Sequence, residues 1–89
     1  MHMKYQNFYK LCQEHPEHIQ ELFNLFFTHE ELEMLGARYE IIKLLTKQEL
    51  TQREIAHKQK VSIAQITRGS NALKILSPKL KKILSQFSW

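Results

Sequence analysis

Two short helices, predicted almost back to back, decide the fold of this chain. Both lie in "LTQREIAHKQKVSIAQITRGSNALK", residues 50–74. Thr51-Gln52-Arg53-Glu54 and Ser62-Ile63-Ala64-Gln65 each match the capping box. In that motif a hydroxyl accepts from the backbone N–H three residues on, and the Glu or Gln side chain reaches back. The pattern predicts helices over residues 52–59 and 63–75, joined by a short turn.

The rest of the chain shows helical periodicity and no strand pattern. Thr28 begins a third capping box, and Pro16 and Pro78 each suit the first turn of a helix. With only two glycines and two prolines in 89 residues, the fold class is predicted to be all-α, with six helices. The four helices outside the opening stretch are expected at about residues 4–14, 16–27, 29–47 and 78–87.

The length of 89 residues predicts a single domain. Cys12 is the only cysteine, so no disulfide forms within one chain, and the composition suits a cytoplasmic protein. A large apolar load falls on one short helix, whose bulky residues cover more than one face. These residues are Leu22, Phe23, Leu25, Phe26 and Phe27. Because burying each contributes about 1.5–3 kcal/mol, we expect an intertwined homodimer. A compact monomer with one helix buried on all sides is the alternative.

Charge is unevenly distributed along the chain. Residues 1–49 carry five Lys and Arg against eight Glu, a net charge of −3, whereas residues 50–89 carry eight against one, a net charge of +7. A basic half of this kind is typical of a surface that binds a polyanion such as DNA. A solvated lysine-rich face is the alternative.

Two short helices joined by a tight turn in a basic setting are typical of a helix-turn-helix. Apolar residues fall where such a unit needs its internal core, at Ile55, Ala56, Val61, Ile66 and Leu73. The start of the second helix is then left exposed, and a helix placed in this way can enter the major groove of DNA. An ordinary helical hairpin is the alternative on these grounds alone.

Three motifs resemble the tryptophan repressor family. Leu35-Gly36-Ala37-Arg38 is similar to the leucine-glycine-x-arginine of that family's long central helix. Thr51 to Glu54 resembles its "SQRE" motif, and Ile66 to Asn71 reproduces its "ITRGSN". The resemblance covers about residues 22–80. It implies an intertwined helical homodimer that binds L-tryptophan as corepressor and then operator DNA, with a dimerisation core and part of the ligand pocket in 1–49, a helix-turn-helix in 50–75 and a C-terminal helix in 76–89.

The resemblance also implies residue roles. Arg38 is expected to meet the tryptophan carboxylate, Arg68 to lie against the indole, and Gly69 to leave room for the ring. Thr28 and the carbonyls of Leu25 and Phe27 are expected to contact the ring and accept from the ammonium group. Without the resemblance, Arg38 could instead pair with a glutamate on its own helix, and Gly69 could reflect packing alone. The positions expected to face DNA are Gln52, Arg53, Ile63, Ala64, Gln65, Thr67, Arg68 and Lys74.

The sequence departs from the family pattern at several positions. Ala72 stands where the best-known members have a serine near the ligand ammonium. Lys60-Val61-Ser62 replaces a Gly-Ala-Gly turn, so this turn must form without glycine's freedom at positive φ. Ala56 replaces a lysine and Gln65 replaces a threonine, and both changes bear on operator sequence.

Other classes of function fit less well. The chain has no aspartate, no glycine-rich phosphate loop and no nucleophile beside a base, so an enzyme is not expected. Cys12, His15 and His18 are close in sequence, but Pro16 interrupts them and no metal site is predicted. No membrane partner and no cofactor besides the corepressor are expected. The alternatives are a ligand-independent helix-turn-helix regulator on the same scaffold and a helical protein-interaction module.

Overall fold

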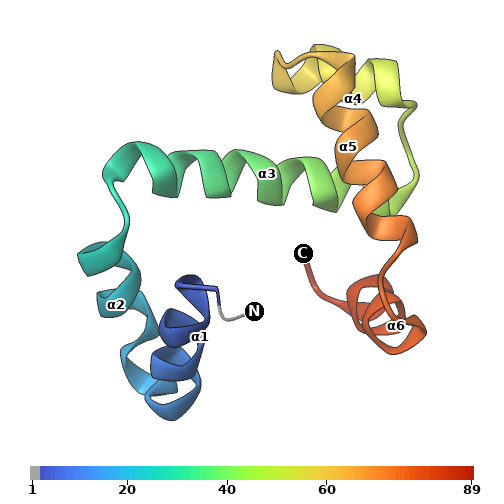
Figure 1. The fold of residues 1–89 in the computed structure, drawn as a ribbon. Helices are drawn as coiled ribbons and strands as arrows, with labels where there is room; N and C mark the ends of the chain where they lie inside the picture. The colour runs from blue at the N-terminus through green and yellow to red at the C-terminus, as the bar shows by residue number, and fades with distance from the viewer. Residues whose placement is uncertain (1–2) are drawn as a thin grey trace. The chain divides into compact units, whose positions relative to one another are not determined.

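The computed structural model describes residues 3–89, and over that range the chain is helical with no strand. Met1 and His2 lie outside the described residues, and the sequence assigned no role to Met1-His2-Met3. Six α-helices and one 3-10 turn follow one another along the chain (Figure 1): α1 (Tyr5–Glu14), η1 (Pro16–His18), α2 (Ile19–Phe26), α3 (His29–Lys47), α4 (Gln52–Gln59), α5 (Ile63–Lys74) and α6 (Pro78–Gln86). The prediction of six helices is confirmed, with the difference that Pro16 begins a 3-10 turn before α2.

The chain divides into two compact units, Met1–Met34 and Leu35–Trp89, and α3 begins in the first and continues into the second. Across residues 3–89 no helix combines the length and the apolar content needed to cross a bilayer.

The first unit is organised around one aromatic side chain. The ring of Phe8 on α1 lies 5.6 Å from that of Phe23, 5.2 Å from Phe26 and 5.6 Å from Phe27, measured between centroids. None of the described residues of this unit is fully buried. Leu25 remains 75% exposed and Phe26 56% exposed, so the unit leaves a large apolar surface uncovered.

The second unit has a small core built by α3, α4 and α5. Ile55 and Ile66 are completely buried, and Ala56 and Ile41 are nearly so. The partly buried side chains packed around them are Leu44, Leu45, Leu50 and Val61. The predicted core positions Ile55, Ala56 and Ile66 are therefore confirmed, and Val61 packs against them, whereas Leu73 is only half-buried and is not part of this core. The burial of Ile41 was not predicted, because α3 is apolar on adjacent faces here and its periodicity does not select one of them.

The helix starts follow from their capping residues. Thr51 forms a complete capping box, in which its hydroxyl accepts from Glu54 N–H at 3.1 Å and its own N–H donates to Glu54 Oε1 at 2.9 Å. The box at Ser62 is only half formed. The Ser62 hydroxyl accepts from Gln65 N–H at 3.3 Å, but no described hydrogen bond returns from the Gln65 side chain to Ser62 N–H.

The turn between α4 and α5 is closed by backbone hydrogen bonds. Val61 N–H donates to Ala56 O at 3.0 Å and Lys60 N–H donates to His57 O at 3.2 Å, which is the Schellman arrangement. Lys60 takes the left-handed conformation that this arrangement requires, with φ 56° and ψ 45°. The turn therefore forms without glycine, as the sequence demands, and Lys60 bears the conformational cost.

We expect Lys60→Gly to stabilise the fold by about 0.5–1 kcal/mol. The left-handed conformation costs a residue with a Cβ about 1–2 kcal/mol, and the greater freedom of glycine in the unfolded chain cancels part of that gain. Lys60→Ala is the matched control, because it removes the same charge and keeps the Cβ. Chemical denaturation of the three proteins measures the effect. Equal free energies of unfolding for the Gly and Ala variants would contradict it.

Candidate nucleic-acid interface and ligand site

One side of α5 docks on the protein and the other faces solvent. Ile66 is completely buried, and Gly69, one turn later, lies against α3. The opposite side of the helix carries Ala64, Thr67 and Arg68, all exposed, with Ile63 beside them at 47% exposure. Four of the residues predicted to face DNA thus share one accessible surface. Gln65 and Lys74 are exposed as well, Gln65 at the flank of this surface and Lys74 at the end of α5.

Asn71 extends the same surface and was not predicted as a contact. It follows Thr67 by four residues and Arg68 by three, which places it on the same side of the helix one turn later. That spacing was visible in the sequence, and it is the signal that could have identified Asn71.

The outer side of α4 adds positive charge. Arg53, His57 and Lys58 line an open depression together with Leu50 and Glu54. The sequence predicted only Arg53 here. His57 follows Arg53 by four residues and Lys58 follows Glu54 by four residues, and this helical spacing is the signal that was missed.

Glu54 is the one carboxylate in that depression. The backbone N–H of Thr51, and then its hydroxyl, hydrogen-bond the carboxylate and lower its pKa below the ordinary value. Glu54 is therefore ionised at neutral pH and engaged with the helix cap. The three basic side chains around it make this surface suitable for binding a polyanion.

Arg38 and Arg68 have no ion-pair partner within the described part of the chain. The two glutamates that could have paired with Arg38 on its own helix are engaged elsewhere. Glu33 lies 2.9 Å from His29, and Glu40 lies 3.8 Å from Lys43. Both arginines are exposed, so their guanidinium groups are available to a carboxylate, a phosphate or an aromatic ring.

Gly69 allows α5 to approach α3 closely. A Cβ placed on Gly69 would lie 3.2 Å from Leu45 Cδ1, 3.5 Å from Ile42 Cδ1 and 3.6 Å from Ile41 Cγ2. The absence of a side chain at Gly69 therefore serves helix packing within this unit, whether or not it also makes room for a ligand ring.

This helix contact also relates the two arginines. Arg38 precedes Ile41 and Ile42 by one helical turn on α3, and Arg68 directly precedes Gly69 on α5. The backbone positions of both arginines are therefore close to this helix contact, although the Arg68 side chain lies on the exposed side of α5.

The two mid-helix glycines give a matched pair for testing this packing. Nothing lies within 4 Å of a Cβ on Gly36, whereas a Cβ on Gly69 would press on Leu45. We expect Gly36→Ala to stabilise the protein by about 1 kcal/mol through helix propensity, and Gly69→Ala to give less than this. Gly69→Val should destabilise by about 1–3 kcal/mol through overpacking. Denaturant unfolding measures all three. Equal gains from alanine at both glycines would show that Gly69 is not a packing contact.

The other predicted ligand contacts lie in the first unit. Thr28 forms a complete capping box for α3. Its hydroxyl accepts from Glu31 N–H at 3.1 Å, and its N–H donates to Glu31 Oε1 at 2.8 Å. Among the described hydrogen bonds, none reaches the carbonyl oxygens of Leu25 and Phe27 at the end of α2, so both are free to accept. Arg38, Arg68 and Gly69 lie in the second unit, and the joint role of all six in one pocket stays a prediction.

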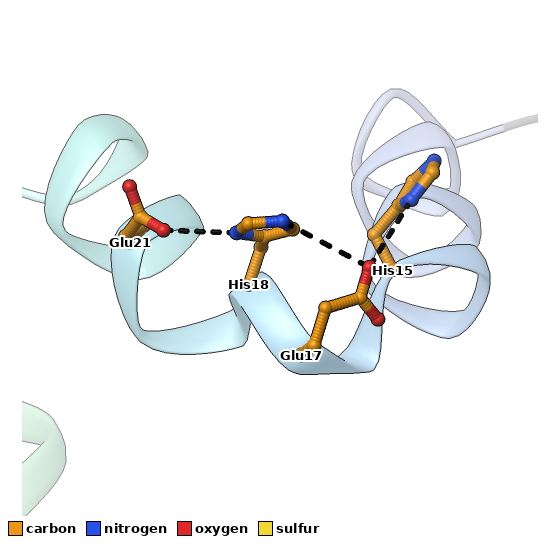
Figure 2. A network of polar contacts seen from close by, with 4 residues as sticks. All are labelled: His15, Glu17, His18 and Glu21. Carbon is orange, nitrogen blue, oxygen red and sulfur yellow. Dashed lines mark hydrogen bonds and ion pairs between the residues drawn. The ribbon is translucent and has the colours of Figure 1, made fainter.

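A polar network joins η1 to the start of α2 (Figure 2). Glu17 Oε1 lies 3.6 Å from His15 Nδ1 and 3.9 Å from His18 Nε2, and His18 Nδ1 lies 2.8 Å from Glu21 Oε1. The histidines thus contact carboxylates. In residues 3–89 no group of three His, Cys, Asp or Glu side chains is arranged to hold a metal ion.

This network gives the first unit a pH dependence. The hydrogen bond and negative charge of Glu21, with a smaller effect of Glu17, raise the pKa of His18 above the ordinary 6.5. A raised histidine pKa stabilises the fold fully below 6.5, and this stabilisation is lost as the pH rises through the raised value. We expect Glu21→Gln to shift the His18 titration, followed by NMR, toward lower pH. An unchanged titration in that variant would contradict the assignment.

Comparison with known proteins agrees with the sequence motifs at residues 35–38, 51–54 and 66–71. The family model described as "Trp repressor protein" matches residues 4–88. A Trp operon repressor homolog of Chlamydia trachomatis serovar D is 50% identical over 84 residues, which cover 92% of this chain and 89% of that protein. The homolog of Chlamydia caviae is 48% identical, covering 92% and 83%. That of Mannheimia succiniciproducens is 42% identical over 59 residues, covering 66% and 58%. The chain belongs to the Trp repressor family.

Proposed function

We propose that this protein is an L-tryptophan-activated transcriptional repressor that binds, as a homodimer, the operator DNA of genes for tryptophan biosynthesis or uptake. The observation that carries the proposal is the accessible side of α5, where Ala64, Thr67 and Arg68 lie opposite the docked Ile66 and Gly69. Membership of the family supports the same role. The function is regulatory, without a catalytic step.

In this proposal α4 and α5 form a helix-turn-helix. The Schellman turn at Lys60 and the shared core of Ile55 and Ile66 hold the two helices together, so α5 can act as the recognition helix. The net charge of +7 over residues 50–89 supplies attraction to the phosphates, with Arg53 and Lys58 on the outer side of α4.

The corepressor is proposed to use the two unpaired arginines. A guanidinium group can donate two parallel hydrogen bonds to a carboxylate and can also lie flat on an aromatic face. These properties suit Arg38 to the carboxylate of tryptophan and Arg68 to its indole ring. Binding at the crossing of α3 and α5 would fix the angle of the recognition helix, and this links the ligand to DNA affinity.

The test is a titration of a labelled tryptophan-biosynthesis promoter with the protein, with and without L-tryptophan, followed by fluorescence anisotropy. L-tryptophan is expected to raise DNA affinity about 5- to 150-fold, and the same DNA must raise L-tryptophan affinity by the same factor. L-phenylalanine is the control ligand. Promoter affinity that does not change with L-tryptophan would contradict the proposed activation.

One observation favours a second candidate, a DNA-binding regulator that needs no ligand. Ala72 is exposed and carries a methyl group where the resemblance leads us to expect a serine hydroxyl for the ligand ammonium. The titration separates the two functions, because the second predicts tight promoter binding in the absence of any amino acid.

A further inference from the structure

One hydrogen bond joins the side chains of α4 and α5. Thr67 Oγ1 donates to Gln52 Oε1 at a distance of 3.1 Å. Among the described residues it is the one bond between side chains of these two helices, and its partners are 15 residues apart. Gln52 and Thr67 were both predicted to face DNA, but their contact with each other was not predicted.

The backbone is held in place at both partners. Gln52 is the first residue of α4, directly after the capping box of Thr51, and it is half-buried. Thr67 directly follows Ile66, which is completely buried and fixes the backbone of α5 at this point. The bond is already present in the free chain, at an exposed position.

The bond divides the hydrogen-bonding capacity of the pair. A threonine hydroxyl has one proton and two lone pairs, and here the proton is used on Gln52. Toward solvent, Thr67 is left with lone pairs only. The amide nitrogen of Gln52 keeps its two donors, which can be offered to a phosphate oxygen.

We propose that Gln52 is a positioning residue that makes the Thr67 hydroxyl an obligate acceptor in the major groove. This rests on the proposed DNA-binding function. In that groove adenine presents the N6 amino group and cytosine the N4 amino group as donors, whereas guanine N7 and O6 and thymine O4 only accept. Thr67 then favours adenine or cytosine at one position in each half-site.

The expected preference is measurable. A bidentate base contact discriminates by about 5- to 150-fold against the wrong base, and the single acceptor of Thr67 should discriminate by about 5-fold, the lower end of that range. Thr67 shares the exposed side of α5 with Ala64, one turn nearer the start of the helix, so the contact falls within the segment that approaches the base edges.

The experiment is selection of binding sites from a randomised double-stranded DNA library, with L-tryptophan present. Wild type, Thr67→Ser, Thr67→Val and Gln52→Met are compared. Wild type and Thr67→Ser should select adenine or cytosine at one position per half-site. Thr67→Val should lose that preference, because valine keeps the shape and lacks the acceptor.

Gln52→Met is the decisive variant. Methionine has a similar length and cannot take the Thr67 proton, so the hydroxyl becomes free to donate as well as accept. We expect guanine and thymine to be accepted at the position where wild type excludes them. A role of Gln52 in stiffening the two helices would instead weaken binding to all sequences evenly and leave the base preference unchanged.

The outcomes separate this proposal from the function on which it rests. A wild-type protein that selects no sequence would show that the proposed function fails. A wild-type protein that selects a clear site, with the same preference in Gln52→Met or with guanine or thymine at the Thr67-dependent position, would overturn the role of Gln52 alone.

Discussion

Replacing Arg38 by alanine should abolish L-tryptophan binding while leaving weak, salt-sensitive DNA binding. The guanidinium is exposed and free of carboxylate partners among residues 3–89, because Glu33 and Glu40 contact His29 and Lys43. A forked contact to the ligand carboxylate consists of two charge-assisted hydrogen bonds, each contributing about 1.5–3 kcal/mol. Their loss predicts affinity lower by about 100-fold or more, measured by isothermal titration calorimetry.

Two controls sharpen that result. Arg38→Lys keeps the charge and loses the fork, so it should bind L-tryptophan with intermediate affinity. Lys43→Ala removes a cation of the same helix that already contacts Glu40, and it should bind as wild type does. Unchanged affinity in Arg38→Ala would remove the carboxylate contact from the proposed pocket.

Arg68→Ala should impair both activities. Arg68 lies on the exposed side of α5 beside Thr67 and next to the Gly69 contact with α3, so it belongs to the proposed groove surface and to the proposed ligand site together. Lower affinity for DNA alone, with normal L-tryptophan binding, would place Arg68 outside the ligand site.

Replacing Leu25 by aspartate should dissociate the proposed homodimer. Leu25 is 75% exposed within its own chain, so nothing there explains a large leucine at this position. Burying that side chain against a partner contributes about 1.5 kcal/mol or more, and a two-fold interface counts each change twice. With the added cost of a buried charge, the dimerisation constant should fall by at least about 100-fold.

The control for Leu25→Asp is Asn24→Asp, which adds the same charge at the preceding exposed residue of α2. Sedimentation gives the mass of each protein, and the melting temperature of an obligate dimer rises with protein concentration. A wild-type protein that sediments as a monomer and melts independently of concentration would contradict the proposed dimer and would favour the compact monomer.

The positions of the helices were determined by the sequence itself. Thr28, Thr51 and Ser77 start helices because their hydroxyls accept from backbone N–H groups only three residues away. Such bonds depend on a handful of neighbouring residues, so they can be predicted without knowing the rest of the fold. The core positions Ile55 and Ile66 were predictable for the same reason, since each is set by the period of a short helix.

Contacts between helices were decided only by the tertiary structure. Three features depend on residues that are far apart along the chain. They are the burial of Ile41, the approach of Gly69 to Leu45 and the hydrogen bond from Thr67 to Gln52. Helical periodicity shows which residues share a side of a helix, but not which neighbouring helix that side meets or how closely. That distance is set by the packing of whole helices, and it is why Gly69 and Gly36, alike in sequence, have different surroundings.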